Sequence, residues 1–190
     1  GGLAIAAWGP CEASVKLPGG SVTLVVDTNY PFSEAIAVTV SVEKAFAFPL
    51  HLRIPSWAAG ASVRVGDESF ASTPGSMLKI ERLWQDGDQV QLTFPMPVRV
   101  ERGHAGLVSV FRGPLLFALK MGESWVEVGG ELPHGDWEVY PTTPWNYGLL
   151  LGDDVAIELA DTQPPAAVPF ETEAAPVTLR VQGKRLPHWL

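Results

Sequence analysis

The fold class is decided by the stretch Ala35-Ile36-Ala37-Val38-Thr39-Val40-Ser41-Val42. Isoleucine and valine occupy every second position, and alanine, threonine and serine fill the positions between them. Successive side chains of a β-strand point to opposite faces, so this stretch predicts a strand with one buried face. The stretch 48–54 repeats the pattern, with Phe, Leu, Leu and Ile at alternate positions.

Outward from these two stretches, short β-rich segments follow one another along the chain. Further strands are predicted at 1–8, 21–27, 63–65, 77–82, 90–94, 98–101, 107–112, 115–119, 125–128, 137–140, 155–159 and 177–182. The turn signal Asp86-Gly87 predicts a β-hairpin that joins 80–84 to 90–94. No stretch of ten or more residues shows the apolar stripe of a helix.

Many short strands separated by Gly and Pro predict an all-β fold of two packed antiparallel β-sandwiches, jelly-roll or immunoglobulin-like. Strands follow closely before Gly103, and longer loops are predicted after it, at 129–135, 141–147 and 161–176. We therefore expect domains at 1–103 and 104–190, packed rigidly because no Gly/Ser linker joins them. A single split sandwich is the alternative.

Composition excludes several function classes. The 190 residues include 13 basic and 21 acidic side chains, for a net charge of −8. Nucleic acid is therefore not an expected partner, because phosphate binding needs clustered Lys and Arg. No apolar run reaches the roughly 18 residues of a membrane helix. The single cysteine excludes an internal disulfide and a zinc site built from several cysteines. Because the chain begins within a predicted strand, it reads as part of a longer protein, whose compartment the sequence does not indicate.

Four segments carry a family resemblance. They are Pro-Leu-His-Leu-Arg-Ile-Pro-Ser-Trp at 49–57, Trp-Gln-Asp-Gly-Asp at 84–88 with Pro-Met-Pro-Val-Arg at 95–99, Arg-Gly-Pro-Leu-Leu-Phe-Ala-Leu at 112–119, and Trp-Glu-Val-Tyr-Pro-Thr-Thr-Pro-Trp-Asn-Tyr at 137–147. In this order they resemble the C-terminal β-sandwich region of the β-L-arabinofuranosidase family, glycoside hydrolase family 127.

The resemblance implies a missing partner for this chain. Family members carry an N-terminal (α/α)6 barrel with a cysteine nucleophile, a glutamate acid/base and a zinc ion held by cysteines and a glutamate. None of these residues has a counterpart here, so no catalytic residue and no cofactor is assigned, and zinc is expected only in the barrel. Family chains also continue past the position of Trp189, which implies that the second sandwich lacks a closing strand.

The chain's own acids, histidines and cysteine are the candidate catalytic or metal-binding groups. Glycoside hydrolysis commonly uses two carboxylates about 5–10 Å apart, and the candidate pairs are Glu127 with Glu131 and Asp136 with Glu138. We interpret them as solvated surface acids. The four histidines show no metal-ligand spacing. Cys11 is interpreted as a small, partly buried side chain at a strand edge.

Aromatic residues supply the candidate sugar-binding site. Trp137, Trp145 and Tyr147 cluster near Asn146 and Glu138, and flat aromatic rings stack on sugars. The alternative is that these rings pack at the joint between the sandwiches or against the barrel. Two functions therefore remain open. One is a non-catalytic accessory region that supports its own barrel and contributes oligomer contacts, and the other is a stand-alone carbohydrate-binding module.

Overall fold

A computed structural model describes residues 2–152, 157–171 and 173–188, and it confirms the all-β class. Among these residues the helical structure is confined to a 3-10 turn, His104–Gly106. No helix in the described part is long and apolar enough to span a membrane. The chain divides into two compact units, residues 1–116 and 117–190. The predicted boundary between folding domains at 103/104 stays a prediction.

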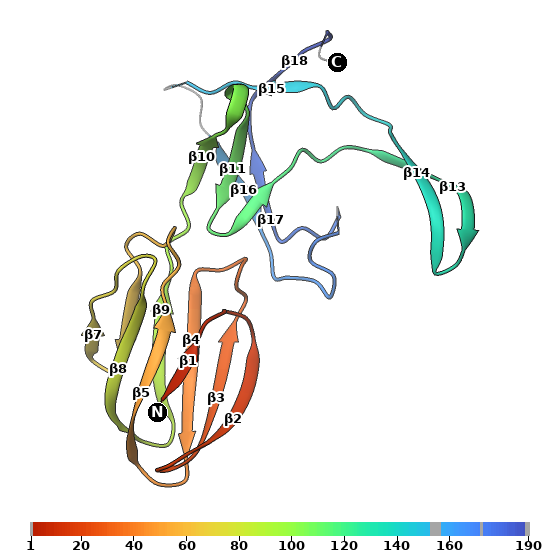
Figure 1. Cartoon of the computed structure of the whole chain (residues 1–190). Coiled ribbons are helices and arrows are strands. Elements are labelled where there is room, and N and C mark those ends of the chain that lie inside the picture. The colour runs from red at the N-terminus through yellow and green to blue at the C-terminus, as the bar shows by residue number, and fades with distance from the viewer. Residues whose placement is uncertain (1, 153–156, 172, 189–190) are drawn as a thin grey trace. The chain divides into compact units, whose positions relative to one another are not determined.

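The first unit contains a sandwich of two sheets (Figure 1). The larger sheet has six strands in the order β2 (Cys11–Leu17), β3 (Gly20–Thr28), β4 (Ala35–Val42), β9 (Asp88–Thr93), β6 (Ser62–Val65) and β7 (Glu68–Phe70). The smaller sheet has three, in the order β1 (Leu3–Ile5), β5 (Phe46–Arg53) and β8 (Met77–Trp84). The strand pairs are antiparallel except β1–β5, which is parallel.

The apolar alternation of the sequence forms the core between these sheets. The isoleucine and the three valines of β4 are all buried, as predicted, and so are the alternate apolar residues of 48–54. Full burial of each such side chain contributes about 1.5–3 kcal/mol. Trp84 is fully buried on β8, and its indole N–H donates to the carbonyl oxygen of Phe48 at 3.0 Å.

The predicted hairpin between 80–84 and 90–94 is wrong. β8 pairs with β5 in the smaller sheet, whereas β9 lies between β4 and β6 in the larger one. The turn that joins them crosses from sheet to sheet and is held by β4: the Val42 amide donates to the Asp86 carboxylate at 3.1 Å, and the Gly87 amide donates to the carbonyl oxygen of Val40 at 2.9 Å. Two strands facing each other across a sandwich show the same alternation as a hairpin, so the local pattern did not distinguish them.

A third sheet of the first unit follows the sandwich strands. It contains β10 (Val98–Arg102), β11 (Val108–Arg112) and β12 (Leu115–Phe117), with β11 in the middle and β12 reaching the first residue of the second unit. β10 and β11 are antiparallel, and Val98 pairs with Arg112. Gly113 follows with a φ of 54°, the left-handed region that glycine adopts without strain.

The second unit forms three two-stranded antiparallel sheets in its described residues. They pair β13 (Glu123–Glu131) with β14 (His134–Pro141), β15 (Tyr147–Leu149) with β18 (Gly183–Arg185), and β16 (Glu158–Thr162) with β17 (Val177–Arg180). The loop predicted at 129–135 is therefore wrong, because both strands continue to a short turn at Leu132-Pro133. Residues 155–156 of one predicted strand, and Trp189, lie outside the described residues.

Candidate functional site

A groove of about 450 Å³ opens on the outer face of the six-stranded sheet. It is lined by Asp27, Thr28, Asn29, Ser33, Ala35, Ile36, Ala37, Gln91, Leu92 and Thr93. Strand register explains the hollow: Ala37 on β4 is paired with Asp27 on β3 and with Gln91 on β9. Directly paired residues share a face, so a short alanine lies between two longer side chains.

The groove is lined by hydrogen-bonding groups with little charge. Asp27 is its one charged lining residue; Asn29 and Gln91 bring amides that both donate and accept, and Ser33 and Thr93 bring hydroxyls. No group of three or more His, Cys, Asp or Glu side chains that could hold a metal ion occurs in the described part of the chain. The lining therefore suits a neutral ligand with several hydroxyl groups.

The loop between β3 and β4 forms one rim of the groove and is held by its own hydrogen bonds. The Thr28 hydroxyl donates to the carbonyl oxygen of Ala35 at 2.8 Å and accepts from the Tyr30 amide at 3.0 Å. The Phe32 amide donates to the carbonyl oxygen of Asn29 at 2.8 Å. The Tyr30 ring stacks on Trp57 with centroids 6.5 Å apart, and burial raises the pKa of the Tyr30 hydroxyl, an effect that Arg53 opposes.

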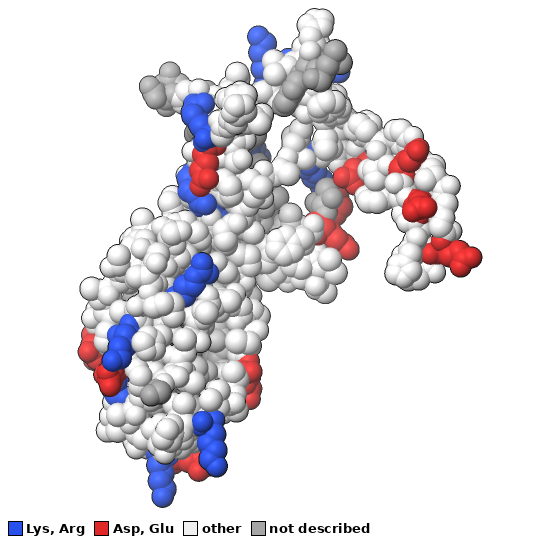
Figure 2. All heavy atoms as spheres, in the orientation of Figure 1, with Lys and Arg blue, Asp and Glu red and all other residues white. Residues whose placement is uncertain are grey.

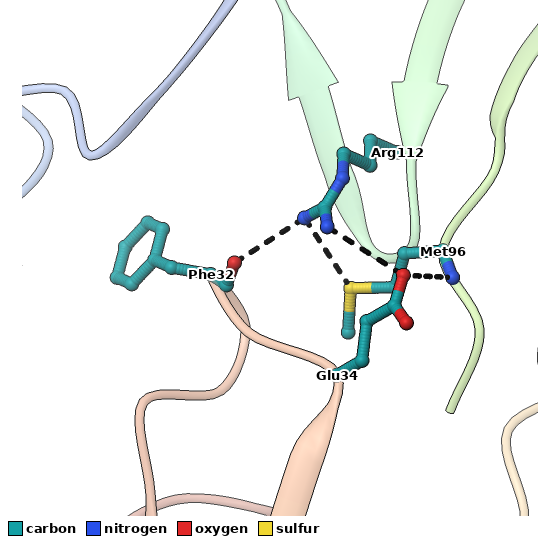
Figure 3. A network of polar contacts seen from close by, with 4 residues as sticks. All are labelled: Phe32, Glu34, Met96 and Arg112. Atoms are coloured by element: carbon teal, nitrogen blue, oxygen red, sulfur yellow. Dashed lines mark hydrogen bonds and ion pairs between the residues drawn. The ribbon is translucent and has the colours of Figure 1, made fainter. Parts of the chain in front are cut away.

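The same loop is tied to the third sheet by a buried arginine (Figure 3). The Arg112 guanidinium, 9% exposed, donates to the carbonyl oxygen of Phe32 at 3.2 Å. It also lies 3.6 Å from the Glu34 carboxylate and 3.8 Å from the Met96 sulfur. The same Glu34 oxygen accepts from the Met96 amide at 2.8 Å, so one carboxylate joins three segments of the chain. Sequence analysis did not single out Glu34 or Arg112 as a pair, because they lie far apart in the chain.

The hairpin of β13 and β14 presents exposed aromatic and apolar side chains. Trp125 and Trp137 are 58% and 45% exposed, and their rings meet edge to face with centroids 6.4 Å apart. By register Trp125 is paired with Val139, and Trp137 with Glu127, so these four residues share one face. Further exposed apolar residues of the hairpin are Val126, Val128, Leu132 and Tyr140.

Acidic residues accompany the aromatic ones on this hairpin. Residues 121–179 contain no Lys or Arg, and Figure 2 shows acidic side chains along the hairpin. Both candidate carboxylate pairs lie here, and all four side chains are exposed, as expected for solvated acids. Tyr140 donates a hydrogen bond to Glu138, and this bond, with a smaller contribution from desolvation, raises the pKa of the tyrosine.

Of the three residues in the predicted sugar platform, Trp137 has a described ring contact. Its partner is Trp125, a residue that sequence analysis did not select. Trp145 is exposed between β14 and β15. Tyr147 is half-buried and begins β15, where it is paired with Arg185. A platform of Trp137, Trp145 and Tyr147 stays a prediction. The pairing of β13 with β14 places Trp125 beside Trp137 as a further exposed aromatic residue.

Cys11 is exposed, whereas the sequence analysis interpreted it as partly buried. It is a free and exposed thiol at the start of β2, the edge strand of the six-stranded sheet. Every residue of β2 except Leu17 is exposed. The larger sheet has six strands and the opposing sheet three, and β2 is an edge strand of the larger one. The histidines at 104, 134 and 188 are exposed and His51 is half-buried.

Comparisons with known proteins identify a matching family and similar solved structures. The family described as "Beta-L-arabinofuranosidase, GH127 middle domain" matches residues 2–96. Ara127N, a GH127 β-L-arabinofuranosidase from Geobacillus stearothermophilus T6, is 30% identical over 82% of this chain and 23% of its own, with a TM-score of 0.60. No curated protein matches.

Two further solved structures share the fold at lower identity. A glycoside hydrolase is 20% identical over 96% of this chain and 31% of its own, with a TM-score of 0.56. A GH127 β-arabinofuranosidase is 17% identical over 95% of this chain and 30% of its own, with a TM-score of 0.54. The chain therefore spans less than a third of each of the three structures.

Proposed function

This chain belongs to the GH127 family of β-L-arabinofuranosidases, and we propose that it is the non-catalytic β-sandwich region that supports a catalytic barrel in a longer glycoside hydrolase. As a GH127 middle domain over residues 2–96, it is an accessory domain of a GH127-like protein. The short span of the chain on its solved relatives supports the proposal, because those proteins contain a large part that this chain lacks.

The observation that carries the proposal is the exposed surface of the β13–β14 hairpin. Tryptophans, valines and Leu132 are uncovered there on neighbouring positions of two strands. Contiguous exposed apolar side chains of this kind mark protein interaction sites in soluble proteins. We assign the barrel of the same protein as the occupant of this hairpin.

The negative charge of the hairpin indicates which kind of barrel surface would be complementary to it. The hairpin carries Glu123, Glu127, Glu131, Asp136 and Glu138 and no Lys or Arg. Complementarity across an interface then calls for an apolar surface on the barrel with Lys or Arg at its rim. Tryptophan at the centre of such a contact contributes more binding energy than most other residue types.

The test begins with the coding sequence that precedes residue 1, which should encode a barrel. That barrel and this chain are expressed as separate polypeptides and mixed, and complex formation is followed by light scattering. We expect a one-to-one complex and a higher melting temperature for the barrel. An upstream sequence without a barrel, or a barrel unchanged by this chain, would contradict the proposal.

Matched variants locate the contact. Trp137→Ser removes an exposed side chain from the hairpin, whereas Leu83→Ser removes an exposed apolar side chain from β8 of the sandwich. We expect Trp137→Ser to weaken the complex by at least about tenfold, since hot-spot truncations cost about 2 kcal/mol or more. Leu83→Ser should bind as the wild type does, and equal losses in both variants would argue against the hairpin.

A second candidate is a carbohydrate-binding module that uses exposed aromatic rings. The exposure of Trp125 and Trp137, together with that of Trp145, favours it. Titration of an arabinofuranosyl trisaccharide should then change tryptophan fluorescence, and Trp137→Ala should abolish the change. An unchanged emission spectrum at saturating sugar would exclude ring stacking.

A further inference from the structure

We propose that the groove over β3, β4 and β9 is a binding site for a neutral saccharide, recognised through its hydroxyl groups by Asp27, Asn29 and Gln91. The site is assigned from the lining of the groove alone. Only the choice of an arabinose-containing probe rests on the proposed function of the preceding section.

The width of the groove follows from strand geometry. Asp27 and Gln91 flank Ala37 from the two neighbouring strands, so they stand two strand spacings apart, about 9–10 Å. Ala35 is paired with Thr93 on the same face, two residues along β4. A sugar ring lying between these rows has methyl groups of two alanines beneath it and polar side chains on both sides.

The chemistry of the side chains selects the ligand class. The Asp27 carboxylate only accepts hydrogen bonds, whereas the amides of Asn29 and Gln91 donate and accept, as sugar hydroxyls also do. Asp27 disfavours an anionic ligand, and no Lys or Arg lines the groove. A phosphate or carboxylate ligand is therefore disfavoured relative to a neutral polyol.

The rim of the groove is ordered before any ligand arrives. Thr28 is fixed by two hydrogen bonds, and the carbonyl oxygen of Asn29 accepts from the amides of Phe32 and Ser33 at 2.8 and 3.3 Å. Arg112 holds the carbonyl oxygen of Phe32 from the other side of the loop. A preorganised loop loses less conformational entropy on binding, which favours a small polar ligand in an open groove.

The test is a calorimetric titration of the whole chain with an arabinofuranosyl trisaccharide, repeated with xylose-based and glucose-based trisaccharides. Two matched pairs of variants locate the site. Gln91→Ala alters the groove, whereas Gln89→Ala alters the same face of the same strand outside it. Ala37→Gln fills the groove, whereas Ser41→Gln adds the same side chain further along β4.

We expect saturable binding of at least one trisaccharide. Gln91→Ala should weaken it by about two- to tenfold, the loss that follows from one or two hydrogen bonds, and Ala37→Gln should abolish it. Gln89→Ala and Ser41→Gln should bind as the wild type does. Thermal unfolding of each variant establishes that it is folded.

Three results would overturn the assignment: no saturable binding of any of the three trisaccharides, equal effects in Gln91→Ala and Gln89→Ala, or binding that survives Ala37→Gln and disappears in Trp137→Ala. The last result would transfer the sugar site to the hairpin. The first two results leave the association with a barrel untouched, so the groove can fail while that proposal stands, whereas the last result would favour the carbohydrate-binding candidate on the hairpin.

Discussion

The guanidinium of Arg112 donates to the carbonyl oxygen of Phe32, which lies 80 positions earlier in the chain, at 3.2 Å. This contact fastens β11 to the β3–β4 loop of the sandwich. Both residues belong to the first unit. The groove rim and the third sheet are thus held by the same side chain.

Replacing Arg112 by alanine should destabilise the first unit. The substitution leaves the carbonyl oxygen of Phe32 without this donor, and hydrogen bonds to charged groups contribute about 1.5–3 kcal/mol. The ion pair with Glu34 adds little, since that carboxylate is partly exposed. We expect a loss of about 1–3 kcal/mol in chemical unfolding. Arg102→Ala, an exposed position on β10, is the control, and equal losses in both variants would contradict this role.

Substituting Gly113 should show a packing cost as well as a backbone cost. Its φ of 54° is close to the 57° of Gly66, so alanine is strained at both positions by about 1–2 kcal/mol. A Cβ at Gly113 would lie 2.6 Å from the sulfur of buried Met96, whereas nothing lies within 4 Å at Gly66. Gly113→Ala should therefore be the more destabilising variant by about 1–3 kcal/mol. Equal melting temperatures would show that Met96 moves aside without cost.

Trp84→Phe should weaken the core beyond the loss of apolar area. The variant leaves the carbonyl oxygen of Phe48 without its indole donor and opens a small cavity beside it. We expect about 2–4 kcal/mol of destabilisation, combining an unsatisfied buried acceptor with lost packing. Trp137→Phe is the matched control at an exposed site and should change the unfolding free energy by less than about 0.5 kcal/mol. The prediction fails if both variants unfold alike.

Tyr140 should titrate at higher pH than an ordinary tyrosine. Its hydroxyl donates to the Glu138 carboxylate, and ionisation of the phenol would remove that bond and place two negative charges together. Glu138→Gln removes the charge and should return the pKa of Tyr140 towards its usual value. Ultraviolet absorbance of tyrosinate during a pH titration measures the shift, with Glu131→Gln as the control. An unchanged titration in Glu138→Gln would exclude the hydrogen bond as the cause.

The alternation of apolar residues predicts the sandwich well because burial of one strand face is a local property. It fails where the outcome depends on pairing. The segments 80–84 and 90–94 belong to different sheets, although their pattern and turn are those of a hairpin. β2 was missed although Cys11, Ala13, Val15 and Leu17 alternate with polar residues, and as an edge strand it buries almost none of them. Glycines at 129 and 130 indicated a loop, but strand pairing continues through them with a bulge.

The candidate sites likewise depend partly on local sequence, which can be read directly, and partly on strand pairing, which cannot. Sequence clustering selects Trp137, but its contact with Trp125 requires the register of β13 and β14. The groove cannot be predicted from the sequence of any one strand, because Asp27, Ala37 and Gln91 come together only through two strand pairings. The Glu34–Arg112 contact likewise joins residues that carry no motif.

The lack of Lys and Arg around the β13–β14 hairpin has a practical consequence for peptide mapping. Trypsin cleaves after Lys and Arg, and none occurs between Lys120 and Arg180. Complete digestion therefore releases the whole hairpin on a single peptide, 121–180, with its three tryptophans together. Oxidative footprinting of the chain, alone and mixed with the barrel, then compares solvent access to Trp125 and Trp137 within one mass-spectrometric species.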